Sequence, residues 1–151
     1  GLVVSLPDPE ALGQAIKDAV ASGVPVITMN SGLESSAAVG ALMHVGQPEY
    51  LAGQSAGARA KAEGATNALC MMHEQYNTAL NDRCNGYGEN VPLASTVDTT
   101  SDPATITTRA AAALQANPDV DSSVCWTTYL RWRTASDRRA GHVSAPLMLR
   151  S

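Results

Sequence analysis

The sequence contains no phenylalanine and few aromatic residues of any kind. Aromatic residues make up 4% of its 151 residues, whereas hydrophobic residues make up 44%. The core must therefore be built from Val, Ile, Leu, Ala and Met, which suits alanine-rich helices packed on aliphatic strands. Charged residues make up 16% of the chain. This composition is typical of a folded globular protein and excludes a charge-rich disordered chain.

Positive charge is scarce over most of the chain. Through residue 125 there are five Lys and Arg against thirteen Asp and Glu, a net charge of −8. No basic run occurs before residue 130, which argues against a nucleic-acid-binding surface because phosphate neutralisation needs clustered Lys and Arg. No hydrophobic run reaches the roughly 18 to 20 residues that a bilayer span needs. The nucleotide-binding pattern G-x-G-x-x-G is absent as well.

The final segment, residues 126–151, differs from the rest in charge. It carries five Arg against one Asp and holds both tryptophans, and its apolar residues follow neither a helical nor a strand period. Two interpretations stay open. The segment is either an exposed basic tail or a stretch in which the reading frame departs from the ancestral sequence.

Apolar runs and helix signals alternate regularly along the chain. The expected strands are residues 1–6, 25–29, 41–46, 67–72, 93–97 and 120–125. The expected helices are residues 9–22, 48–63, 78–89 and 103–116. Because the strands are apolar along their full length, we expect helices on both of their faces. The sequence therefore predicts an α/β fold of parallel sheets flanked by helices.

Polar side chains follow two of the expected strands. Asn30 and Ser31 come directly after the strand at residues 25–29, and His73 and Asn77 follow the strand at residues 67–72. Ligands of open parallel sheets bind beyond the carboxyl ends of the strands, and amide and hydroxyl groups suit a neutral polyol. The alternative is that Asn-Ser-Gly is simply a turn that ends a strand.

Several stretches together resemble one family. They are LVVSLPDPEALGQAIKDAVASGVPVITMNSG, HVGQPEYLAGQSAG, NDRCNGYGE and ALQANPDVD, in that order. They resemble the periplasmic sugar-binding proteins of ABC importers, of the ribose-binding type. The resemblance implies an incomplete two-lobed fold, in which residues 1–46 are the later part of the N-terminal lobe and residues 47–125 the first part of the C-terminal lobe. Residues 126–151 form the atypical tail.

The resemblance also implies site residues. The family often places Asp-Arg where this chain has Asn30 and Ser31, and an arginine where it has Asn81, so charged groups are replaced by neutral ones. Asn30 and Asn81 are expected to face a common gap that holds a neutral sugar or polyol. Arg83 matches a scaffold position of the family. The implied partner is the permease of an ABC importer, the implied location is periplasmic or extracytoplasmic, and no cofactor is expected.

Two further questions stay open at this stage. Cys70 and Cys84 form either a disulfide, favoured in an oxidising compartment, or two buried thiols. The alternative function is the ligand-sensing core of a transcription regulator of the lactose repressor type. An enzyme using His73 and Glu74 is a remote third interpretation, because one Cys and one His near a strand end do not make a metal site, and no enzymatic activity is expected.

Overall fold

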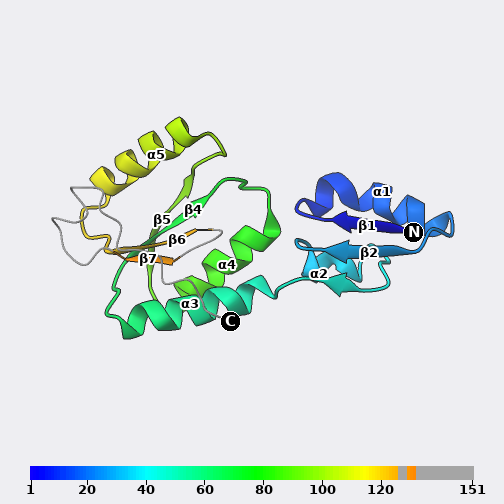
Figure 1. The fold of residues 1–151 in the computed structure, drawn as a ribbon, viewed down its shortest axis with the longest axis horizontal. Coiled ribbons are helices and arrows are strands. Elements are labelled where there is room, and N and C mark those ends of the chain that lie inside the picture. The colour runs from blue at the N-terminus through cyan, green and yellow to red at the C-terminus, as the bar shows by residue number, and fades with distance from the viewer. Residues whose placement is uncertain (126–128, 132–151) are drawn as a thin grey trace.

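The computed structural model describes residues 1–125 and 129–131, which form two sheets flanked by helices (Figure 1). The strand order is β1-β2-β3 in the first sheet and β5-β4-β6-β7 in the second. All neighbouring strands are parallel except β6 and β7, which are antiparallel. The predicted α/β fold with parallel sheets is confirmed.

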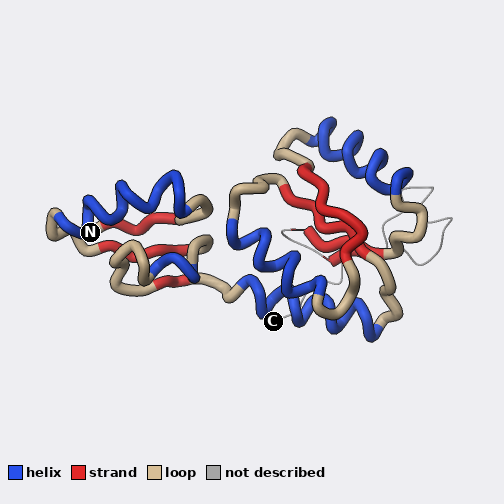
Figure 2. The backbone as a smooth tube through the Cα atoms, turned by 180° about the vertical axis from the view of Figure 1, so that it is seen from behind, coloured by secondary structure: helices blue, strands red, loops and turns tan. Residues whose placement is uncertain are grey.

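The elements fall into two units. The first unit contains β1 (Leu2–Ser5), α1 (Pro9–Ala21), β2 (Val26–Met29), α2 (Leu33–Ser36) and β3 (His44–Val45). The second unit contains α3 (Glu49–Ala62), β4 (Ala68–Met72), α4 (Thr78–Gly88), β5 (Leu93–Asp98), α5 (Pro103–Ala116), β6 (Ser122–Cys125) and β7 (Tyr129–Arg131). A short linker, residues 46–48, joins them, and Figure 2 shows it as one extended crossing.

Local signals set the ends of α1. The Asp8 carboxylate accepts hydrogen bonds from the backbone N–H groups of Glu10 and Ala11, both at 3.0 Å, and Pro9 occupies the first helical turn. Such a cap satisfies donors that have no partner inside the helix. Gly23 follows the helix with φ of +82°, a conformation that glycine adopts without strain. The sequence therefore defines this helix by itself.

The structure corrects two expectations about the strands. The strand expected at residues 41–46 is limited to β3. Leu42 and Met43, which precede β3, still bond the backbone of β2: the Leu42 N–H donates to the Val26 carbonyl oxygen at 2.8 Å, and the Met43 carbonyl oxygen accepts from the Thr28 N–H at 3.1 Å. Coverage of both faces holds for β4, but Leu2 and Val3 of β1, whose side chains point to opposite faces of the sheet, are both exposed. Helix α2 and strand β7 were not expected. Apart from β7, the predicted tail lies outside the described residues.

The second unit is a layered structure. Helices α3 and α4 run side by side along one face of its sheet, and α5 covers the other face (Figures 1 and 2). The side chains between the sheet and the α3–α4 pair form its core, which includes Ala60, Ala68, Cys70, Met72, Leu80, Cys84, Tyr87, Val91 and Val124. Helix α5 contributes no buried residue. The pair α3–α4 therefore carries most of the apolar packing of this unit.

Glycines allow α3 and α4 to touch backbone to backbone. A Cβ added at Gly53 of α3 would lie 2.1 Å from the carbonyl oxygen of Arg83, and one added at Gly86 of α4 would lie 2.1 Å from that of Tyr50. Real Cβ atoms do not approach backbone atoms so closely. The two helices can keep this separation only with glycine at both positions.

The same glycines explain a pattern in the sequence that resembles a hydrolase motif. Residues 53–57 read G-x-S-x-G, a pattern that places a nucleophilic serine on a sharp strand-to-helix turn in hydrolases. Here the segment lies inside α3, and Ser55 is exposed on a regular helix. Gly53 and Gly57 serve the contact with α4, so the pattern has a packing role.

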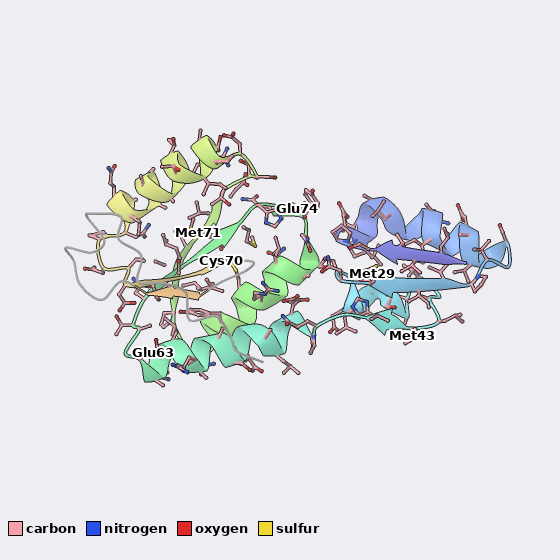
Figure 3. The ribbon with its side chains drawn as sticks, viewed as in Figure 1. Met29, Met43, Glu63, Cys70, Met71 and Glu74 are labelled. Carbon is pink, nitrogen blue, oxygen red and sulfur yellow. A yellow bond between two sulfur atoms is a disulfide. The ribbon has the colours of Figure 1, made fainter. Side chains whose placement is uncertain are left out.

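A disulfide joins α4 to the central strand of the second sheet. Cys70 of β4 and Cys84 of α4 are bonded, with their Cα atoms 5.9 Å apart (Cys70 is labelled in Figure 3). Both residues are buried, at 0% and 6% exposure. Of the two alternatives left open by the sequence, the structure contains the disulfide.

Reduction of the disulfide is expected to destabilise the chain. Closing a loop with a sequence separation of 14 residues restricts the unfolded state, and for a loop of this size the stabilisation is about 3 kcal/mol. Reductant should lower the urea midpoint of the wild type and leave the Cys70→Ala/Cys84→Ala variant unaffected. A wild-type midpoint that does not change on reduction would contradict the prediction.

Adding one methyl group at Gly53 is also expected to be destabilising. Gly53→Ala forces the α3 and α4 backbones apart and should lower the free energy of unfolding by about 1–3 kcal/mol or more. Gly88→Ala is the matched control, because its Cβ would lie 3.4 Å from Leu93 Cδ1, an ordinary contact. Equal urea midpoints for the two variants would refute the backbone contact.

Candidate functional site

A cavity of about 300 Å³ lies between the two units. Met29, labelled in Figure 3, ends β2, and the turn that follows it contributes Asn30 and Gly32 to the cavity. Its walls are formed by Asn30, Gly32, Leu33, Glu34, Gln47, Pro48, Glu49, Tyr50, Leu51, Ala79 and Asp82. Both units and the linker therefore contribute to it.

The Asn-Ser-Gly turn after β2 supplies part of the wall. Asn30 has φ of 63°, a left-handed conformation that asparagine tolerates, and its N–H donates to the Val45 carbonyl oxygen at 3.0 Å. Gly32 has φ of +95°, and an added Cβ would lie 2.6 Å from Leu6, so glycine is required there. Ser31 is buried at 3% exposure. The turn thus presents Asn30 to the cavity and places Ser31 behind it.

The asparagines of the second unit stabilise the loop between β4 and α4. The Asn77 side chain accepts from the Ala79 N–H at 3.1 Å and donates to Glu74 Oε2 at 2.9 Å. The Asn81 amide nitrogen donates to the carbonyl oxygens of Gln75 and Asn77, at 3.0 and 3.1 Å. The Asn77 and Asn81 amide groups thus bond atoms of this loop, and Asn81 does not line the cavity that Asn30 lines.

Of the five residues expected to bind ligand, Asn30 lines the cavity. Ser31, Asn77 and Asn81 do not line it, and neither does His73, whose Nε2 lies 3.8 Å from Glu74 Oε1. A binding role for these four residues therefore stays a prediction.

Four polar residues of the cavity were missed by the sequence analysis: Glu34, Gln47, Glu49 and Asp82. Gln47 lies in the segment where the chain was expected to cross between lobes. Asp82 follows Asn81 directly and so projects from α4 about 100° further around the helix axis. The sequence therefore indicated that α4 borders the site, but it did not indicate which side of the helix faces the cavity.

Glu49 is held in the wall by two partners. Its Oε2 accepts from Arg83 Nε at 2.6 Å and from Gln47 Nε2 at 3.2 Å. The Arg83 and Glu49 side chains are 17% and 13% exposed, so the ion pair is largely shielded from solvent. This pair agrees with the scaffold role predicted for Arg83, which braces α3 against α4 and does not line the cavity.

The cavity is acidic. Burial raises the pKa of the Asp82 carboxyl, and the nearby carboxylates of Glu34 and Glu49 raise it further. Glu34 belongs to the first unit and Asp82 to the second, so like charges face each other across the cavity. Carboxylates accept hydrogen bonds and repel anions. The arrangement suits a ligand that donates several hydrogen bonds and carries no negative charge.

Two features are absent from residues 1–125 and 129–131. No group of three or more His, Cys, Asp or Glu side chains is placed there to hold a metal ion. In the same part of the chain, no helix has the length and apolar character needed to span a bilayer.

Comparison with known proteins identifies relatives of this arrangement. A family model described as "Periplasmic binding protein domain" matches residues 1–131. A carbohydrate transporter from Acidothermus cellulolyticus 11B, solved in complex with myo-inositol, is 40% identical, with a TM-score of 0.77 over 83% of this chain and 44% of that one.

Two further solved structures share the fold. A periplasmic sugar-binding protein of an ABC sugar transporter from Legionella pneumophila has a TM-score of 0.74 at 20% identity, over 84% of this chain and 49% of that one. An ABC transporter solute-binding protein from Burkholderia graminis C4D1M, in complex with D-arabinose, has a TM-score of 0.70 at 23% identity. The match covers 82% of this chain and 44% of that one. The chain thus spans less than half the length of these structures. A search of curated proteins gave no match.

Removing the Asp82 charge is expected to stabilise the chain at neutral pH. The folded-state pKa of Asp82 is raised, so ionisation of this group costs stability above that pKa and costs none below its unfolded-state pKa. Asp82→Asn should therefore have a higher urea midpoint than the wild type at pH 7, and the difference should shrink as the pH falls toward 3. A difference that is constant with pH would show that charge is not its cause.

Proposed function

The chain belongs to the periplasmic binding protein domain family, and from that premise we propose that it is the ligand-binding part of a sugar or polyol receptor that serves an ABC importer. The observation that carries the proposal is the cavity, whose walls come from both units and whose volume of about 300 Å³ falls in the range of small-molecule sites. Residues 1–46 and 47–125 would then belong to the two lobes of the receptor.

The chemistry of the walls supports a neutral, hydroxyl-rich ligand. Asn30 and Gln47 provide amide donors and acceptors, while Glu34 and Asp82 provide acceptors for ligand hydroxyl groups. Apolar side chains, among them Leu33, Pro48 and Leu51, offer surface for the C–H groups of a sugar ring. The myo-inositol complex of the 40% identical relative supports the same ligand class.

The remaining parts of the proposal concern partner and location. The disulfide between Cys70 and Cys84 supports an extracytoplasmic protein, since structural disulfides form in oxidising compartments. Delivery of ligand to a membrane permease follows from the family. No observation favours a transcription regulator.

A titration tests the proposed ligand class. We expect the 151 residues alone to bind weakly or not at all, because they span 44% of the length of the myo-inositol-binding relative. In a protein of the relative's length that contains this chain, we expect myo-inositol or D-arabinose to bind in calorimetry, and Asn30→Ala to weaken this binding by about 5- to 150-fold, because a buried ligand hydroxyl loses its partner at a cost of about 1–3 kcal/mol. Gln14→Ala is the control, since Gln14 bonds Asp18 on the exposed side of α1. Unchanged affinity in Asn30→Ala, or equal affinity for a neutral sugar and its uronic acid, would count against the acidic cavity as the site.

A further inference from the structure

We propose that the hydrogen bond from the Thr78 N–H to the Pro7 carbonyl oxygen is a latch that holds the two units closed around the cavity. The bond is 3.1 Å long and joins the first residue of α4 to the loop between β1 and α1. It therefore crosses from one unit to the other at a place separate from the linker. The latch requires that the cavity lies between the two units, but it does not depend on which ligand the cavity binds.

The Pro7 side of the latch is fixed to one wall of the cavity. The N–H of Leu6 donates to the Ser31 carbonyl oxygen at 3.1 Å, and Leu6 is fully buried. Gly32, which lines the cavity, lies so close to Leu6 that no side chain would fit between them. Any movement of Pro7 relative to the second unit therefore moves the wall that carries Asn30.

The Thr78 side of the latch is fixed to the opposite wall. Asn77 caps α4, and the side chains of Asn77 and Asn81 tie the preceding loop to this helix. Ala79 and Asp82, in the first turns of the same helix, line the cavity. Asn77 and Asn81 are therefore positioning residues, because they fix Thr78 relative to the wall formed by Ala79 and Asp82.

The position of Thr78 in the helix leaves its N–H available. The first N–H groups of an α-helix have no acceptor within the helix, and Asn77 satisfies that of Ala79. Thr78 is the first residue after the cap, so its N–H is free to reach the other unit. Here the acceptor is the Pro7 carbonyl oxygen.

The latch acts against charge repulsion. Closing the units brings Glu34 of one wall toward Asp82 of the other, and both are carboxylates. In the absence of a ligand that donates hydrogen bonds to them, this repulsion favours opening. A hydrogen bond between the two walls opposes it.

Proline at position 78 tests the latch with little cost to the helix. Proline lacks the N–H and is favoured at the first helical position. Asn77, with φ of −77° and ψ of 108°, already has the extended conformation that a residue before proline requires. The proline ring also places a carbon toward the Pro7 oxygen, so Thr78→Pro excludes the closed arrangement. Thr78→Ala keeps the N–H and is the matched control.

Residual dipolar couplings of backbone amides report whether the units move together. We expect residues 1–45 and 49–125 of the wild type and of Thr78→Ala to fit one alignment tensor, and those of Thr78→Pro to need two. A common tensor for Thr78→Pro, or separate tensors for Thr78→Ala, would overturn the latch.

Amide exchange in the wild type decides the matter if Thr78→Pro does not fold. We expect the Thr78 amide to exchange about 10-fold more slowly than that of Glu49, which has the same position at the start of α3. Equal exchange rates would overturn the latch. Neither measurement uses a sugar, so failure of the proposed function in calorimetry leaves both readouts intact.

Discussion

The close contact between α3 and α4 is the constraint on which the candidate site depends. Gly53 and Gly86 let the two backbones touch, and no other residue fits at either position without a shift of the helices. Helix α3 starts at the linker and brings Glu49 into the cavity. Helix α4 starts at Thr78, which bonds Pro7 of the first unit, and brings Ala79 and Asp82. Because the helices are fixed against each other, so are these walls.

The carboxylates of the cavity repel one another across its walls. Glu34 and Asp82 lie on opposite walls, and Arg83 is engaged with Glu49, so the acidic character is only partly neutralised. Hydroxyl groups of a polyol can donate to both walls at once, which converts the repulsion between the walls into attraction through the ligand. A ligand that donates hydrogen bonds to both walls would therefore add to the Thr78–Pro7 hydrogen bond in holding the units together.

The polar residues at the strand ends show how one residue type can serve two purposes. The sequence places Asn30 and Asn77 after strands, and the family resemblance points to Asn81 in the following helix, so all three were expected to meet a ligand. An asparagine amide bonds a backbone group as readily as a sugar hydroxyl. In the structure Asn30 lines the cavity, whereas the other two organise the loop that leads into α4.

The sequence by itself determined the order and type of the main elements, because caps, apolar runs and terminating glycines act over a few neighbouring residues. It also identified the family through several short stretches. The pairing of Cys70 with Cys84, the contact at Gly53 and the presence of Asp82 in the cavity were decided only by the tertiary structure. Each of these depends on the distance between segments that are far apart in the chain or on the rotation of a helix about its axis, and no local pattern specifies either.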